Sequence, residues 1–112
     1  MPKPPIDEYE RGLDLLRRGE FFAAHEELEL AWRAATSDER DFYQGLVHVA
    51  VAWYQAGRGN RYGCKRQLAK AEQRLSPFEP AHRGVDVASV VAQVRAAATR
   101  VEAGSLDLPP PL

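Results

Sequence analysis

Apolar residues recur every three or four positions along almost the whole chain, a spacing that places them on one face of an α-helix. This pattern predicts helices over residues 7–18, 20–34, 38–56, 61–75 and 86–103. No segment alternates apolar and polar residues for long enough to indicate a β-strand. The sequence therefore predicts an all-α fold, a single bundle of about five antiparallel helices joined by short turns.

Three of these helices begin at residues that favour capping. Thr36 followed by Glu39 has the form of a capping box, which would open the third helix. Asn60 and Asp86 stand before the fourth and fifth helices. Both residue types are favoured there because their side chains accept a hydrogen bond from a free backbone amide.

The remaining segments are predicted to be loops and ends. Residues 76–84 contain two prolines and a glycine, which predicts a loop, and we expect His82 within it to face the solvent. A chain of 112 residues fits one domain, so residues 1–112 are expected to form a single all-helical domain. We expect residues 1–6 and 105–112, at its two ends, to be flexible.

Composition and charge narrow the classes of function. The formal net charge of -1 removes the usual electrostatic argument for binding nucleic acid. The longest apolar stretch, residues 45–53, is far shorter than the ~20 residues that cross a bilayer. The single cysteine, Cys64, fits a reducing compartment. We therefore expect a cytoplasmic protein that binds neither membranes nor nucleic acid.

A weak internal repeat relates the second and fourth helices at a shift of 40 residues. The aligned pairs are Gly19 and Gly59, Ala24 and Cys64, Leu28 and Leu68, and Ala31 and Ala71. The first copy also resembles half of a tetratricopeptide repeat. Two copies are too few to form a repeat array. Small residues at this spacing let any two helices pack closely, and we favour this packing explanation over a true repeat.

The second helix carries the main candidate for a functional site. His25 and Glu29 are four residues apart, so their side chains lie one turn apart on one face. The same face carries Phe22 and Trp32, which predicts that it faces the core. A carboxylate in such a place is costly unless it is paired or hydrogen-bonded, so the pair requires an explanation.

The first explanation is structural. His25, Glu29 and the indole N–H of Trp32 would join a polar network with Gln44, and with His48, on the third helix. Such a network fixes the register of packed helices when every member is satisfied.

The second explanation is a metal site. Residues 25–29 read His-Glu-x-x-Glu, one ligand type away from the zincin motif. His25 and Glu29 would bind a divalent metal such as zinc with His48 as third ligand, and Glu26 would be the base of a hydrolase. Catalytic zinc needs three protein ligands and the second helix supplies only two. We therefore favour the structural explanation and expect no cofactor.

The fourth helix predicts a weaker site because its charged residues are mostly basic. Its start, together with the turn before it, offers an anion site made of Arg58, Asn60, Arg61 and Lys65. The competing explanation is an ordinary solvated face, and the near-zero net charge favours that explanation.

Residues 21–33, 42–60 and 63–75 resemble the family called domain of unknown function 309, small all-helical proteins of bacteria and archaea with relatives in plants. The resemblance spans residues 13–75. The residues at characteristic positions of the family are His25, Glu26, Glu29, Trp32, Gln44, Gly45, Asn60 and Lys70. It implies an all-α bundle with a shared polar motif, and it implies no activity. The family often has histidine where this chain has Tyr54, which removes that position as a metal ligand.

The sequence as a whole predicts a non-enzymatic protein that binds a partner protein or a small ligand near a polar cluster between its central helices. The predicted members of the cluster are His25, Glu26, Glu29, Trp32, Gln44 and Tyr54. The alternatives are the metal-dependent hydrolase and a phosphate or RNA contact on the fourth helix. Short amphipathic helices can leave an apolar face uncovered, so a homodimer is also compatible with the sequence.

Overall fold

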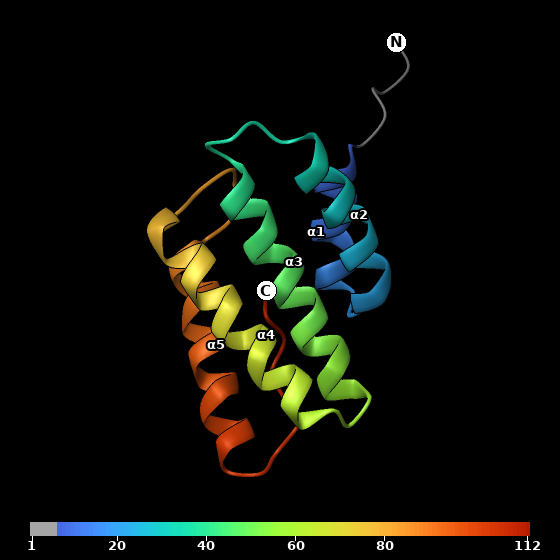
Figure 1. The fold of residues 1–112 in the computed structure, drawn as a ribbon, viewed down its shortest axis with the longest axis vertical. Helices are drawn as coiled ribbons and strands as arrows, with labels where there is room; N and C mark the ends of the chain where they lie inside the picture. Colours follow the sequence, from blue (N-terminus) through green and yellow to red (C-terminus); the bar gives the residue numbers. More distant parts are fainter. Residues whose placement is uncertain (1–6) are drawn as a thin grey trace.

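The computed structural model describes residues 7–112, which form five α-helices and one short 3-10 helix (Figure 1). The elements are α1 (Glu8–Arg17), α2 (Phe21–Ala34), α3 (Arg40–Gly57), α4 (Arg61–Leu75), η1 (Ser76–Phe78) and α5 (Val87–Glu102). No strand occurs in this part of the chain, so the all-α prediction is confirmed. None of these helices is long and apolar enough to cross a membrane. Residues 1–6, predicted to be flexible, lie outside the described residues.

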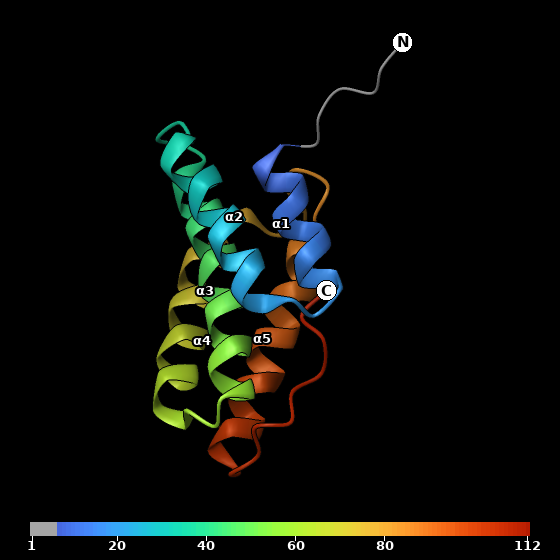
Figure 2. The same ribbon diagram turned by 90° about the vertical axis from the view of Figure 1, so that its right-hand side faces the viewer.

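Helix α3 lies at the centre of the molecule. It packs against α2 on one side and α4 on the other, while α1 packs on α2 and α5 packs on α4 (Figures 1 and 2). The apolar stripe of this helix is buried, with Phe42, Leu46 and Val49 fully inaccessible and Trp53 4% exposed. A single core therefore runs through all five helices.

The helix starts agree with the predicted caps at two places and differ at a third. The Asn60 side chain accepts from the amide of Gly63 at 2.9 Å, and Asp86 caps α5 in the same way. The capping box at Thr36 is wrong, because α3 begins only at Arg40. The Thr36 hydroxyl instead donates to the carboxylate of Asp38 at 2.6 Å, and this hydrogen bond lowers the pKa of Asp38.

Two helix pairs, α1–α2 and α3–α4, are joined by the same type of turn. Gly19 and Gly59 each adopt a positive φ, 78° and 75°. In both turns the amide after the glycine donates to the carbonyl five residues earlier at 2.9 Å. Two of the residue pairs aligned by the 40-residue repeat are buried on both helices: Ala24, Cys64 and Leu28 are inaccessible, and Leu68 is 1% exposed. Burial also raises the pKa of the Cys64 thiol.

Each pair has a close contact at a glycine. A Cβ atom on Gly12 of α1 would lie 2.6 Å from the side chain of Leu28 on α2. A Cβ atom on Gly45 of α3 would lie 2.6 Å from the side chain of Leu75 on α4. At both places a larger side chain would require the opposing leucine to move.

Residues 105–112, which we call the tail, pack against the bundle. Leu106 and Leu108 lie on the core, and Pro111 is buried. The indole N–H of Trp53 donates to the carbonyl of Pro109 at 2.9 Å. These contacts give the tail a defined course, and the flexibility expected for it stays a prediction about its behaviour in solution.

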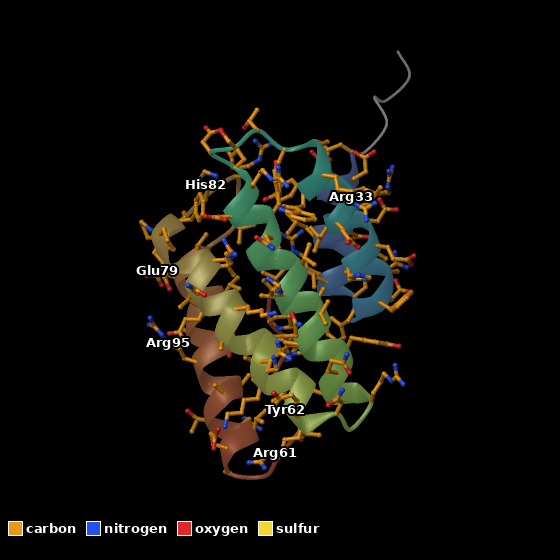
Figure 3. The ribbon with its side chains drawn as sticks, in the orientation of Figure 1. Arg33, Arg61, Tyr62, Glu79, His82 and Arg95 are labelled. Carbon is orange, nitrogen blue, oxygen red and sulfur yellow. The ribbon has the colours of Figure 1, made fainter. Side chains whose placement is uncertain are left out.

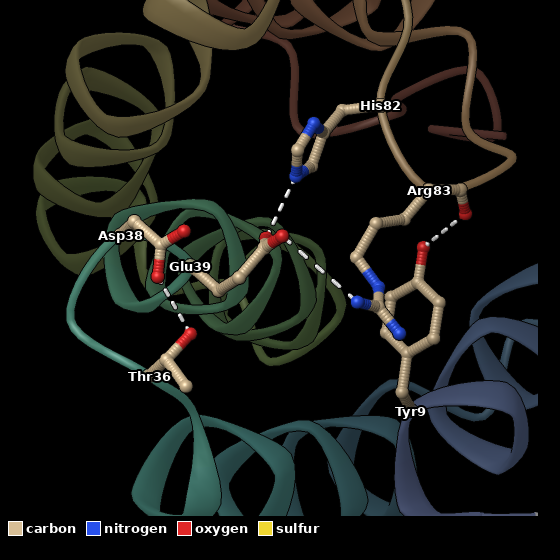
Figure 4. Close-up of polar contacts among 6 residues, drawn as sticks. All are labelled: Tyr9, Thr36, Asp38, Glu39, His82 and Arg83. Carbon is tan, nitrogen blue, oxygen red and sulfur yellow. Dashed lines mark hydrogen bonds and ion pairs between the residues drawn. The ribbon is translucent and has the colours of Figure 1, made fainter.

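The prediction that His82 faces the solvent is wrong. Its ring lies against the rings of Phe42 and Phe78, with centroids 4.6 and 4.8 Å away. Its Nε2 is 2.7 Å from a carboxylate oxygen of Glu39 at the start of α3 (Figure 4). The prediction was wrong because it considered only the loop, whereas Glu39 and Phe42 are about 40 residues away in the sequence.

The residue after His82 ties the same loop to α1. The hydroxyl of Tyr9 donates to the carbonyl of Arg83 at 2.7 Å, and the Arg83 guanidinium lies 5.4 Å from the centre of the Tyr9 ring (Figure 4). Burial raises the pKa of Tyr9 to about 12, so its phenol stays protonated and remains a donor. The 79–86 loop is therefore anchored to α1 and to α3.

Candidate functional site

His25 and Glu29 form a contact on α2, as their spacing predicts. The imidazole Nε2 lies 3.3 Å from a carboxylate oxygen of Glu29, and the other carboxylate oxygen lies 3.4 Å from the guanidinium of Arg33. The Nδ1 atom of His25 lies 3.3 Å from the carbonyl oxygen of Phe22. A neutral imidazole has a single N–H, so it can donate to only one of these two acceptors at a time.

The His25–Glu29 pair is partly open to solvent rather than buried. The side chains of His25 and Glu29 are 27% and 34% exposed. No polar or charged residue among those described is buried. The pair therefore lies at the rim of the α2–α3 contact, where its polar atoms remain hydrated, and it does not require a buried network to satisfy it.

Three adjoining hollows lie along α2 and α3, and His25 lines two of them. The first, of about 210 Å³, is lined by Phe22, His25, Val51, Tyr54 and Gln55. The second, of about 240 Å³, is lined by His25, Glu26, Glu29, Leu30 and Arg33. The third is a wider depression of about 550 Å³ between the start of α2 and the end of α3. We call these hollows together the α2–α3 groove, bordered by residues 19–33 and 51–58.

Aromatic and aliphatic side chains border the α2–α3 groove. Phe22 is 51% exposed, and its ring centroid lies 5.2 Å from that of Tyr54 and 5.4 Å from that of His25. Leu30 is 49% exposed and lies about two turns further along the same face of α2. The guanidinium of Arg58 stacks over Tyr54 at 5.5 Å. The groove is therefore a mixed apolar and polar surface.

The structure brings together part of the predicted polar cluster. His25, Glu26, Glu29 and Tyr54 all line the α2–α3 groove. Trp32 lies on the same helix but its ring carries the guanidinium of Arg40, 5.1 Å from the ring centre. Within residues 7–112, neither Trp32 nor the Gln44 side chain joins the His25–Glu29 pair through a hydrogen bond.

The sequence predicted that Phe22 faces the core, and this prediction is wrong because Phe22 is 51% exposed. Leu30 was not among the predicted site residues. Phe22 follows Phe21 directly, and two adjacent residues of a helix cannot both point into the core. Leu30 also falls outside the buried stripe that Ala24 and Leu28 define. The sequence therefore contained a sign of this exposed apolar surface, namely the apolar residues of α2 that lie outside its buried stripe.

His48 does not join His25 and Glu29. Its Nδ1 lies 2.7 Å from the side-chain oxygen of Gln67 on α4, on the other side of α3 from α2. Burial lowers the pKa of His48, and the nearby positive charges of Lys70 and Arg74 act in the same direction. In the part of the chain that the structure describes, no three His, Cys, Asp or Glu side chains come close enough to hold a metal ion.

The predicted anion site lies around the start of α4, where Figure 3 labels Arg61 and Tyr62. The Asn60 side chain is used as the cap of α4, and the Arg61 guanidinium donates to the carbonyl of Val101. Lys65 forms an ion pair with Glu102 on α5. These side chains are engaged within the protein, so a phosphate or RNA contact stays a prediction.

A family model matches residues 9–67, which run from α1 into α4 and include the whole α2–α3 groove. The chain belongs to the DUF309 family, a domain of unknown function. No curated protein and no solved structure matches it. The part of this DUF309 protein that matches the family model excludes α5, His82 and the tail. The matched part of this chain thus includes the α2–α3 groove, while these other features lie outside it.

Proposed function

We propose that this DUF309 protein is a non-enzymatic binding module and that its α2–α3 groove binds a segment of a partner protein. The observation that carries the proposal is the half-exposure of Phe22 and Leu30 on one face of α2. Apolar side chains exposed together on a small protein mark sites of interaction. The hollow between Phe22 and Tyr54, of about 210 Å³, has the size to receive one apolar side chain of a partner.

The charges beside this hollow indicate the chemistry of the partner. Glu26 and Glu29 line the second hollow, and Arg33 is its one basic residue. A lysine or arginine next to the apolar anchor of a partner would face these carboxylates, and such complementary charges favour encounter and register. The proposed ligand is therefore a segment with an aromatic or aliphatic residue followed within one turn by a basic one.

The two alternatives have less support. A hydrolase at the His25–Glu29 pair needs a third ligand, and His48 points to α4 instead. An RNA contact needs free cations, and two of the predicted ones are held by Val101 and Glu102. Neither argument applies to the α2–α3 groove as a docking surface.

The proposal can be tested by selecting random displayed peptides on the immobilised protein. The selected sequences should place a basic residue near an apolar one. Phe22→Ser should weaken their binding by about tenfold or more, equivalent to at least 1.4 kcal/mol, because it removes the wall of the hollow. Glu29→Lys should weaken it by repulsion of the basic residue.

Tyr62→Ser is the matched control, because Tyr62 is an exposed aromatic residue at the equivalent position of α4. It should leave binding unchanged. Peptides whose affinity depends on Tyr62 and not on Phe22 would contradict the proposal, as would selected peptides without a common apolar residue.

A further inference from the structure

The tail follows α5 through a sharp reversal at Gly104, which has a φ of 93°. The amide of Ser105 donates to the carbonyl of Arg100, and the Arg100 guanidinium donates to the carbonyl of Asp107 at 3.0 Å. The tail then runs back along the bundle toward the end of α1 (Figure 2). It has no regular secondary structure and hydrogen-bonds to the bundle through its main-chain carbonyls.

Three consecutive prolines, residues 109–111, set the conformation of the tail. Proline fixes its own φ and restricts the residue before it to extended conformations. A proline run is therefore already extended before it binds, so docking it costs little conformational entropy. This is the property that aromatic grooves exploit when they recognise proline-rich segments.

The surface under the tail, which we call the tail groove, contains the polar and apolar features of such a recognition site. Trp53 is 4% exposed, and its indole N–H donates to the carbonyl of Pro109. Leu108 packs on the core one residue before this contact, and Pro111 is buried two residues after it. Since the acceptor is a main-chain carbonyl, any extended segment of similar shape can supply it.

The tail does not fill the whole tail groove. A hollow of about 250 Å³ lies beside the tail, and its lining residues are Arg17, Gly84, Val85, Asp86, Ser89, Val90, Pro111 and Leu112. A bulkier ligand would have room there beside the guanidinium of Arg17, while the Asp86 carboxylate already accepts from the amide of Ser89 as the cap of α5.

We propose that the tail groove is a binding site for a proline-rich extended segment of a partner protein, and that the tail occupies it as an internal competitor. A tethered segment acts at an effective concentration in the millimolar range. Partner segments therefore bind only when they exceed this competition or when the tail is released. This site shares Trp53 with the wider hollow of the α2–α3 groove, but Arg17, Leu108 and Pro111 do not line that groove.

The test uses the full chain and a synthetic peptide with the sequence of residues 105–112, blocked at both ends. Leu108→Asp places a carboxylate against the core and should release the tail. The expected result is that this variant binds the peptide about tenfold or more tightly than the wild type, because the internal competitor is gone. Pro110→Ser, at an exposed position of the tail, is the control and should behave as the wild type.

The readout is the indole N–H resonance of Trp53 in a nitrogen-correlated NMR spectrum. In the Leu108→Asp variant this signal should shift and exchange faster with solvent, and the peptide should return it to its wild-type position. The Trp32 indole is the internal reference and should not move. A peptide with alanine at the three proline positions should bind at least about tenfold more weakly, because it is not pre-extended.

Three results would overturn the proposal. The Trp53 signal could fail to return at millimolar peptide, or the alanine peptide could bind as well as the proline peptide. If Leu108→Asp unfolds the protein, the milder Leu108→Ser variant is used, and its failure to bind the peptide would show that the tail is a fixed part of the fold. Phe22→Ser should leave peptide binding intact, which separates this test from that of the α2–α3 groove.

Discussion

The α1–α2 pair and the α3–α4 pair share an interior and differ in their outer faces. Their turns adopt the same geometry at Gly19 and Gly59, and Leu28 and Leu68 are buried at matching positions. On the outer faces the matched residues have different chemistry. The pairs are Phe22 and Tyr62, His25 and Lys65, Glu26 and Arg66, and Leu30 and Lys70.

The buried residues determine how the two helices of a pair pack, whereas the outer residues determine what the pair can bind. The buried positions accept only small or aliphatic residues because the helices are in contact there. The outer positions are free of that constraint, and they carry an acidic and apolar groove on α2 but basic residues on α4. The shared packing of the two pairs therefore does not predict that their outer faces bind similar ligands.

The largest effects are expected where the two pairs are most alike. Leu28→Ala and Leu68→Ala should each lower the free energy of unfolding by about 2–5 kcal/mol, because both leave a cavity in the core. Chemical denaturation measures this loss. Leu30→Ala, at a half-exposed position of the same helix, should change stability by only about 0.5 kcal/mol. A small loss of stability in Leu68→Ala, beside a large loss in Leu28→Ala, would show that the two pairs are not equivalent.

The turns should give the next largest effects. Gly19→Ala and Gly59→Ala should each cost about 1–2 kcal/mol, because an alanine at positive φ is strained even where space is open. Gly57→Ala is the control, since Gly57 also has open space but lies in α3 without a positive φ. It should cost nothing and can gain up to ~1 kcal/mol. Equal effects at positions 57 and 59 would rule out backbone strain as the cause.

A pH dependence is expected of the α3–α4 pair, because His48 of α3 is partly buried against Gln67 of α4. Burial lowers the pKa of His48 below its ordinary 6.5. Between that lowered value and 6.5 the unfolded chain binds more protons, so stability should fall as the pH drops through this window. Urea denaturation at several pH values should show a shallower fall for His48→Gln. An unchanged pH profile in that variant would assign the dependence to other groups.

The smallest stability effects belong to the outer aromatic residues. Phe22→Ser should cost about 1 kcal/mol because the Phe22 ring contacts the rings of Tyr54 and His25. Tyr62 is 71% exposed, so Tyr62→Ser should stay within about 0.5 kcal/mol of the wild type. Thermal unfolding of the two variants measures the difference. A larger loss of stability in Tyr62→Ser would show that the Tyr62 side chain makes packing contacts on the outer face of α4.

Features set by neighbouring residues could be predicted from the sequence. The fourth helix has the bounds predicted for it, and the other helices agree to within two residues at each end. The caps at Asn60 and Asp86 were also predictable, because a cap depends on residues three positions apart.

Features that depend on distant residues could not be predicted in this way. His82 is paired with Glu39, 43 residues away, and this partner cannot be inferred from a loop of prolines. The tail was predicted to be flexible because it is an end of the given sequence, and its hydrogen bond to Trp53, 56 residues away, could not be inferred from the tail itself. The His25–Glu29 contact is local and was predictable, whereas its position at an open rim depends on how α2 packs on α3.

The burial of Cys64 has a practical consequence. Its side chain is inaccessible between packed helices, and it is the only thiol in the chain. A thiol reagent can therefore modify the protein only in conformations in which α4 has separated from its neighbours. The rate at which Cys64 is labelled would then measure how often α4 detaches. The native protein can therefore report helix detachment without an introduced probe.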